Sequence, residues 1–263
     1  MWTRKLLKEN GKTAFKRNYW SCVAVSFILT LLVGGGAGVT FRKNWNTDLN
    51  YNDSIGQGMG GYYNAQIVKY VALFLPVIII ACLIGLAIGI AVSAFLINVI
   101  ELGGNRYFLE NREHKTKVSQ VLFGFSNGNY MNCVKILFLR DLYLVGWTLL
   151  FIIPGIVKAY EYRMISYILA ENPRISKERA FEISRQMMDG HKWEAFVLDL
   201  SFLGWQILSG CTMGIVGFFY VNPYMFATYA EFYTAVKSEA MQRGATNSIE
   251  LPGVGYPEFA EQF

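Results

Sequence analysis

Charged residues are scarce in this sequence. They make up 16% of the 263 residues, whereas a soluble domain usually carries about 25%. Hydrophobic residues make up 53% and occur in long blocks rather than as helical stripes or alternating strand positions. About 20 consecutive apolar residues suffice to cross a bilayer as a helix. The shortage of charge therefore argues against an ordinary soluble domain and predicts an integral membrane protein.

Residues for metal and redox chemistry are scarce as well. The two histidines, His114 and His191, have no cysteine or second histidine at zinc-ligand spacing. The four cysteines stand singly inside apolar blocks, as is typical of small buried hydrophobic residues. No GxSxG, HExxH or P-loop motif occurs. We therefore expect no metal, no cofactor and no catalytic residue, although catalytic partners that meet only in the fold keep an enzyme open as an alternative.

Basic residues are concentrated in four segments between the apolar blocks. Residues 1–18 hold six, residues 101–132 hold four, residues 171–192 hold five, and the tail from Lys237 holds two. Loops rich in Lys and Arg stay on the cytoplasmic side of a membrane. The net charge of +5 is thus explained by topology rather than by a nucleic-acid partner. We predict a multi-pass plasma-membrane protein with both termini in the cytoplasm.

Six apolar blocks are candidates for membrane spans. They cover about residues 19–41, 70–100, 131–153, 157–170, 193–215 and 218–236. A turn is predicted at Pro154–Gly155, so the fourth span is short or tilted. The expected fold is all-α, with six transmembrane helices arranged as three hairpins.

Two ten-residue segments show that the chain contains an internal repeat. "DLYLVGWTLL" begins at Asp141 and "DLSFLGWQIL" begins at Asp199, and five of their ten letters are identical. A shift of 111 residues also aligns the first span with the third, pairing Tyr19 with Tyr130 and placing Thr30 over Asp141. Two spans separate each copy from the next, so the three hairpins are parallel repeats rather than inverted ones.

An amphipathic segment precedes each hairpin. In "ISKERAFEISRQMM" an apolar face opposes the charged residues, with Ser176 as a candidate N-cap and Glu178 in the first turn. The arm "TRKLLKENGKTAFKRN" has the same character, and "TKVSQVLFGFSNGNY" is the weakest of the three. Such helices are predicted to lie along the headgroups. The repeats then cover about residues 1–100, 101–170 and 171–236, followed by a cytoplasmic C-terminal tail over 237–263.

Five separated motifs carry a family resemblance. They are "MWTRKLLKENGKTAFKRNYW", "INVIELGGNRYFLENR", "IIPGIVKAYEYRMISYILAENP", "SRQMMDGHKWEAF" and "PYMFATYAEFY". In this order they resemble the bacterial integral-membrane family known as domain of unknown function 975, over nearly the whole chain to about Val236. The resemblance implies a six-span bacterial plasma-membrane protein and brings no catalytic residues with it.

Acidic residues inside the predicted spans are the first candidates for function. Asp141, with Arg140 beside it, and Asp199 lie in apolar runs, where a carboxylate costs roughly 2.5 to 3.5 kcal/mol on insertion scales. They fit either structural pairing between helices or a ligand or ion pathway. Because Thr30 occupies the equivalent place in the first repeat, the position tolerates a neutral hydrogen-bonding group.

Four further polar residues complete the candidate set. Lys158 and Glu161 share a helical face, whereas Arg163 does not face Glu161, and the group is predicted at the outer end of the third and fourth spans. A satisfied loop and an extracytoplasmic binding vestibule are the two interpretations. Asn222 and Glu231 belong to the sixth span, where Asn222 precedes a proline that is able to break the helix. Interhelical hydrogen bonds are their ordinary role.

The sequence favours a non-enzymatic membrane module. Such a module binds or presents a lipid, an amphipathic peptide or a membrane-protein partner, and membrane lipids or a second copy of the chain are its expected contacts. One alternative is a transporter or channel for a small solute or lipid, which depends on the intramembrane acids. Another is a lipid-acting membrane enzyme, which requires Lys158, Glu161 and the aspartates to converge in one cavity.

Overall fold

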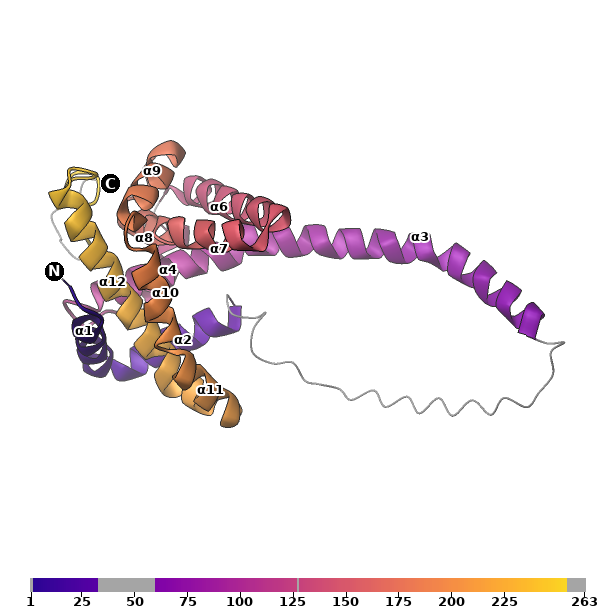
Figure 1. Ribbon diagram of the computed structural model, residues 1–263, viewed down its shortest axis with the longest axis horizontal. Helices are drawn as coiled ribbons and strands as arrows, with labels where there is room; N and C mark the ends of the chain where they lie inside the picture. Colours follow the sequence, from indigo (N-terminus) through magenta and orange to yellow (C-terminus); the bar gives the residue numbers. More distant parts are fainter. Residues whose placement is uncertain (1, 33–59, 127, 255–263) are drawn as a thin grey trace. The chain divides into compact units, whose positions relative to one another are not determined.

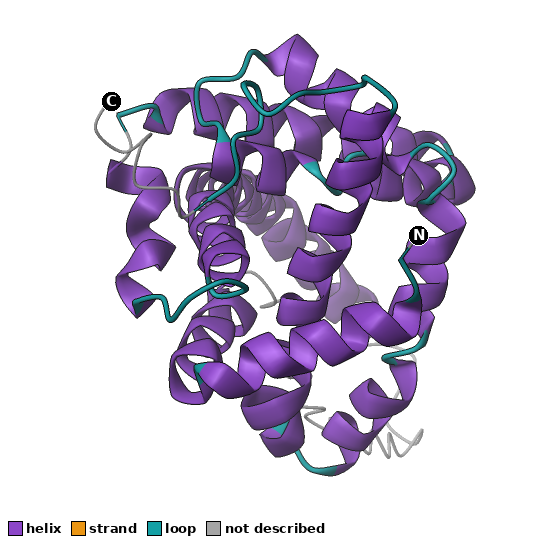
Figure 2. Cartoon of the chain, turned by 90° about the vertical axis from the view of Figure 1, so that its left-hand side faces the viewer, coloured by secondary structure: helices purple, strands orange, loops and turns teal. Residues whose placement is uncertain are grey.

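The computed structural model describes residues 2–32, 60–126 and 128–254, with the side chains of residues 60–68 left out. Within these segments the chain consists of helices and loops, with no strand (Figure 2). The predicted all-α fold class is therefore confirmed. The chain divides into two compact units, one of residues 1–38 and 94–263 and the other of residues 39–93.

The smaller unit contains helix α3, Gly60–Val92. Its apolar side chains are exposed from Tyr70 onward, and Pro76 lies inside the helix. One stretch of described helix, Lys69–Glu110, is long and apolar enough to cross a membrane. The other predicted spans do not reach this standard within the described chain, so the six-span arrangement stays a prediction. Residues 33–41 of the first predicted span lie outside the described residues.

The larger unit holds the remaining helices, which are labelled in Figure 1 except for α5 and the π- and 3₁₀ helices. They are α1 (Arg4–Arg17), α2 (Tyr19–Leu32), the π-helix η1 (Ser93–Ile97, at the unit boundary), α4 (Asn98–Glu110), the 3₁₀ helix η2 (Val118–Leu122), α5 (Phe123–Ser126), α6 (Tyr130–Leu150), α7 (Ile152–Glu161), α8 (Ile165–Glu171), α9 (Lys177–Met188), α10 (Lys192–Leu200), α11 (Leu203–Cys211), the π-helix η3 (Gly217–Val221) and α12 (Asn222–Gln242).

The three amphipathic lead-ins are helical, as predicted. Helix α1 begins after Thr3, whose side chain accepts a hydrogen bond from the Leu6 N–H at 3.2 Å. Helix α9 begins after the predicted cap Ser176, which accepts from the Arg179 N–H at 3.3 Å. These oxygens satisfy N–H groups that lack a partner in the first turn of a helix. The third lead-in forms the short helices η2 and α5.

The apolar faces of α1 and α9 lie against protein, which corrects the prediction that these two faces rest on headgroups, whereas in the third lead-in Leu122 and Phe125 are 58% and 38% exposed. In α9 four residues of the apolar face, Ala180, Ile183, Met187 and Met188, are fully buried. In α1, Leu7, Ala14 and Phe15 are buried, and the exception is Leu6, which is 46% exposed. Burial of these faces against other parts of the chain removes their apolar side chains from water, which stabilises the folded state.

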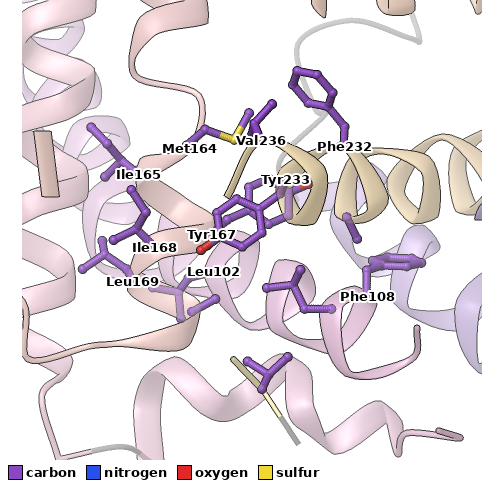
Figure 3. Packing of buried hydrophobic residues seen from close by; sticks show 14 of the residues in the cluster. Leu102, Phe108, Met164, Ile165, Tyr167, Ile168, Leu169, Phe232, Tyr233 and Val236 are labelled. Atoms are coloured by element: carbon purple, nitrogen blue, oxygen red, sulfur yellow. The ribbon is translucent and has the colours of Figure 1, made fainter. Parts of the chain in front are cut away.

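The core of the larger unit lies among α4, α8 and α12 (Figure 3). All seven residues of α8 are buried, and the rings of Tyr167 and Tyr233 stack with centroids 5.1 Å apart. Glycine permits the close approach of α4 to its neighbours. A Cβ at Gly103 would meet the Val121 carbonyl oxygen at 2.0 Å, and one at Gly104 would meet Leu29 at 2.6 Å.

The predicted third and fourth spans are divided differently from the expectation. Helix α6 ends at Leu150, and Phe151 is extended with φ −157° and ψ 138°. Helix α7 then begins at Ile152, so Pro154 and Gly155 belong to its first turn and do not form the predicted turn between the spans. Proline fits the first turn of a helix, because its missing N–H costs no hydrogen bond there. The fourth span is interrupted at residues 162–164, and its second half is the buried helix α8.

The last two predicted spans are also interrupted or covered. The fifth is divided at residues 201–202 into α10 and α11, which have nine residues each. The sixth is continuous through η3 and α12, but much of α12 is buried in the protein. The predicted tail is partly packed: Leu251 is fully buried, and the Gly253 N–H donates to Glu171 at 3.1 Å. Residues 255–263 lie outside the described residues.

Candidate functional site

Asp141 and Arg140 form a polar network with α4. The Arg140 guanidinium donates to Asp141 Oδ1 at 2.9 Å and to the two carboxylate oxygens of Glu101 at 3.3 and 3.4 Å. The Asn98 amide donates to Asp141 Oδ2. The arginine side chain is 11% exposed, and the aspartate is 37% exposed. Arg140 and Asp141 thus bind each other, and each has a further partner, Glu101 and Asn98, that the sequence did not predict.

Asp199 forms a second network, with α7 and the turn that follows it. Arg163 donates to both carboxylate oxygens at 2.9 and 3.0 Å, and the Tyr160 hydroxyl donates to Oδ2 at 2.9 Å. The guanidinium carbon also lies 4.3 Å from the centre of the Tyr229 ring. A two-pronged arginine–carboxylate contact fixes both partners in orientation. Arg163 thus binds Asp199, a partner that the sequence did not predict.

Asn222 connects α12 to α2. Its amide donates to the Thr30 hydroxyl at 3.0 Å. Pro223 follows at the start of α12, and a proline cannot donate to the carbonyl four residues before it. That carbonyl belongs to Phe219, in the π-helix η3, and it accepts a hydrogen bond from the Tyr19 hydroxyl at 3.1 Å. The chain therefore remains helical at the predicted break, and a tyrosine from another repeat satisfies the freed carbonyl.

The same arrangement occurs a second time, at residues related by the internal repeat. Tyr130, the counterpart of Tyr19, donates to the carbonyl of Phe95 in the π-helix η1 at 2.7 Å. Asp141, the counterpart of Thr30, binds Asn98, which follows η1 as Asn222 follows η3. Two copies of the repeat thus make equivalent contacts.

The three repeat-related positions connect the repeats in a closed ring. Thr30 in the first repeat binds a residue of the third, Asp141 in the second binds a residue of the first, and Asp199 in the third binds residues of the second. These contacts give the repeated position a structural role, because at each of its three occurrences it joins segments that are far apart in the sequence.

Glu161 is the centre of a third cluster. Its carboxylate accepts from Lys158 at 2.8 Å, Lys192 at 2.9 Å and Arg185 at 3.1 Å, and its side chain is 5% exposed. The Lys158 pair confirms the predicted shared face. However, Arg185 and Lys192 belong to the segment predicted to be cytoplasmic, whereas Glu161 was predicted at the outer side. Groups within 3.1 Å cannot lie on opposite sides of a membrane, so the predicted outer placement of Glu161 and the predicted cytoplasmic placement of Arg185 and Lys192 do not hold together.

Glu231 is paired as well. Its two oxygens accept from Arg112 at 2.8 and 3.2 Å. Farther along α12, Lys237 binds Glu171 of α8, a pair that the sequence interpretation missed. Among the described residues, no group of three His, Cys, Asp or Glu side chains is arranged to hold a metal ion. The residues of the Arg112–Glu231 and Lys237–Glu171 pairs are far apart in the sequence. The only signal for them in the sequence is the periodicity of each helix, which shows its polar face but not its partner.

A cleft of about 210 Å³ opens beside the first two networks. Its lining combines polar and apolar side chains: Leu29, Glu101, Asn105, Arg163, Ser166, Tyr167, Phe226 and Tyr229. These residues come from α2, α4, α8, α12 and the turn before α8. The cleft is thus lined both by charged side chains that are already ion-paired, Glu101 and Arg163, and by aromatic rings. Lys158, Glu161 and the two aspartates are absent from the residues that line it.

The comparison with protein families identifies the chain. A family model described as "Protein of unknown function (DUF975)" matches residues 6–240. The chain belongs to this family. The match to DUF975 confirms the resemblance that five motifs of the sequence indicated, and it covers all three networks. No curated protein and no solved structure matches the chain.

Proposed function

We propose that this DUF975 protein is a non-enzymatic membrane module that binds lipid. One observation carries the proposal: each candidate acid is held by a cation or a hydrogen-bond donor, whereas large apolar surfaces of α6, α7 and α11 are not covered by the described chain. A free acid or base is what catalysis or proton transfer requires. Exposed apolar surface of this extent is typical of contact with a membrane or a partner.

The proposed arrangement keeps the three parallel repeats, over about residues 1–100, 101–170 and 171–236, as the units. Each repeat supplies an amphipathic helix and a hairpin, and the hairpins enter a bacterial plasma membrane from the cytoplasmic side, where both termini and residues 237–263 lie. The ion pairs around Glu161 support one common side, because they join the base of α7 to the basic segment before α10. Six full crossings are the upper limit of this arrangement.

Identification of the bound lipid tests the proposal. The protein is extracted in native-membrane particles, and the lipids that remain after purification are compared by mass spectrometry with the total lipid of the same membranes. We expect one lipid class to be enriched at a stoichiometric ratio to the protein. A lipid profile equal to that of the bulk membrane would contradict specific binding, and a co-purified peptide, membrane protein or second copy would identify another kind of partner.

A transporter or channel is the second candidate. The observation that favours it is the partial exposure of Asp141 (37%) and Asp199 (30%) near the cleft. Asn at both positions preserves hydrogen-bonding capacity but removes the charge. If the protein carries a solute or lipid along these acids, flux in reconstituted vesicles should disappear in the double variant while the folded protein persists. Unchanged flux, or no flux in the wild type, would eliminate this candidate.

The lipid-acting enzyme gains no support from the geometry. It required Lys158, Glu161 and the aspartates to meet in one cavity. Instead, Lys158 and Glu161 belong to the cluster of α7 and α9, and each aspartate belongs to a separate arginine network.

A further inference from the structure

The exposed end of the α6–α7 hairpin points to a specific contact with lipid. We infer that this hairpin enters the membrane from the side of the Glu161 cluster, turns among the acyl chains and returns without reaching the opposite surface. The inference rests on the proposed membrane function and deepens it, because it assigns one leaflet as the partner of a named surface. Helices α6 and α7 lie side by side in the larger unit (Figure 1).

The turn between the two helices is apolar throughout. Leu149, Leu150, Phe151, Ile152 and Ile153 are 82%, 63%, 70%, 72% and 75% exposed. From residue 149 to residue 157 no side chain carries a nitrogen, oxygen or sulfur atom. Full burial of one such side chain stabilises by roughly 1.5 to 3 kcal/mol relative to exposure in water. A turn on the far side of the membrane would leave five of them in water, whereas a turn among acyl chains leaves none.

Charged side chains mark the depth in the membrane at which the C-terminal end of α7 lies. Glu161 ends the helix, and Arg185, which binds it, is 62% exposed. An exposed arginine belongs at the headgroups or in water, because a charge in the acyl-chain region is costly. Phe151 lies ten residues before Glu161, so a helix of 1.5 Å per residue separates the turn from this level by about 15 Å. The hydrocarbon core is about 30 Å thick, so the turn reaches about its middle.

The α6 arm has the same length. Asp141 lies ten residues before Phe151, which again corresponds to about 15 Å of helix. The Arg140–Asp141 network therefore stands opposite Glu161 across the hairpin. Both arms carry paired charges at one level and apolar residues beyond it. This distribution matches an interface followed by one leaflet, and a complete span would place both clusters near the membrane centre.

The backbone of the turn is suited to a site without water. The Phe151 N–H donates to the Trp147 carbonyl at 3.1 Å, and the Gly155 N–H donates to the Phe151 carbonyl at 3.1 Å. Pro154 has no N–H that needs a partner. The arms also meet closely, since a Cβ at Gly155 would lie 2.6 Å from Thr148 Oγ1. Irregular backbone is costly in lipid unless its polar groups are satisfied, and the two bonds and Pro154 reduce the number of groups that need a partner at this turn.

Acyl chains fit this surface better than a protein partner. A protein interface typically combines an apolar centre with a polar rim and about one hydrogen bond per 100–200 Å². The turn offers no side-chain hydrogen-bonding group across nine residues. The length of the two arms matches one leaflet, which a protein partner would not require.

Single-cysteine labelling tests the inference on the full chain in membrane vesicles. The exposed Cys82 and Cys211 are replaced by serine, and the buried Cys22 and Cys133 are retained. Phe151→Cys then places a thiol at the turn. Ile249→Cys, at a residue that is 88% exposed and belongs to the predicted cytoplasmic end, is the matched control. A charged, membrane-impermeant maleimide is applied to vesicles of each orientation, and an environment-sensitive fluorophore is attached for quenching.

We expect the control thiol to react with the maleimide from one side of the membrane. The F151C thiol should react from neither side until detergent is added. The fluorophore at F151C should be quenched by lipids that carry a spin label near the acyl-chain end. Labelling of F151C from the side opposite to the control would show a complete crossing and overturn the inference. Protection without lipid quenching would also overturn it, in favour of protein covering the turn. Recovery of the protein outside membranes would instead contradict the proposed membrane function.

Discussion

Neutralisation of Glu161 is the perturbation most directly tied to the arrangement of the hairpins. Glu161→Gln keeps the shape of the side chain but removes the charge that three cations share. Hydrogen bonds to a charged group contribute about 1.5–3 kcal/mol, compared with about 0.5–1.5 kcal/mol for neutral ones. The bonds from Lys158 and Lys192 come from side chains that are 24% and 33% exposed. Arg185, at 62%, is discounted because of solvent screening.

Two weakened bonds therefore lower the free energy of unfolding by about 2 kcal/mol. For a chain of this size, 1 kcal/mol corresponds to about 2–4 °C in Tm, so the expected decrease is about 4–8 °C. Thermal unfolding in detergent, followed by intrinsic tryptophan fluorescence, measures it. Glu182→Gln on α9 is the matched control, because Glu182 also binds an arginine but is 53% exposed. The control should change Tm much less.

A double variant separates the ion cluster from general damage. In the E161Q background, Lys192→Gln removes a cation that no longer has its carboxylate, so this second change should cost less than it does in the wild type. Equal costs in the two backgrounds would show that the residues do not interact. A Tm for E161Q equal to that of the Glu182→Gln control would refute the assignment of Glu161 as the centre of the cluster.

Three further predictions use the same thermal assay. Gly11→Ala should cost about 1–3 kcal/mol, because the new Cβ would lie 2.8–2.9 Å from Thr228 atoms on α12; an unchanged Tm would show that α1 and α12 do not pack this closely. Ser176→Ala should cost about 1 kcal/mol through loss of the N-cap of α9, and a neutral result would contradict that cap. Hydrogen bonds from Arg179 lower the pKa of Glu250 below its ordinary value. This contact therefore stabilises the fold fully above a pH of about 4.3, and the stabilisation is lost as the pH falls below it. Glu250→Gln should remove this part of the pH dependence of Tm, and a pH profile identical to that of the wild type would refute the prediction.

Local features were predictable because the residues that cause them are neighbours in the chain. The N-cap of α9 depends on Ser176 and the N–H groups that follow it within one turn. The Lys158–Glu161 pair follows from a spacing of three residues on one helix. The helical class followed from the apolar blocks and the amphipathic lead-ins, and the structure confirms it for the described residues.

The partners of the candidate acids were not predictable in this way. Arg163 is 36 residues from Asp199, Glu101 is 39 from Arg140, and Lys192 is 31 from Glu161. Periodicity shows which face of a helix is polar but not which helix it meets. For this reason the sequence placed Glu161 on the outer side, away from cations that the structure brings into contact with it.

The sequence by itself determined that the chain is helical, rich in apolar surface and built from a repeat that places Thr30, Asp141 and Asp199 at equivalent positions. Only the tertiary structure decided what these positions do. Each binds a different repeat, and the three contacts close a ring. The physical reason is that a polar group among apolar residues must find a partner. The identity of that partner depends on which helices pack together, which is a property of the whole fold.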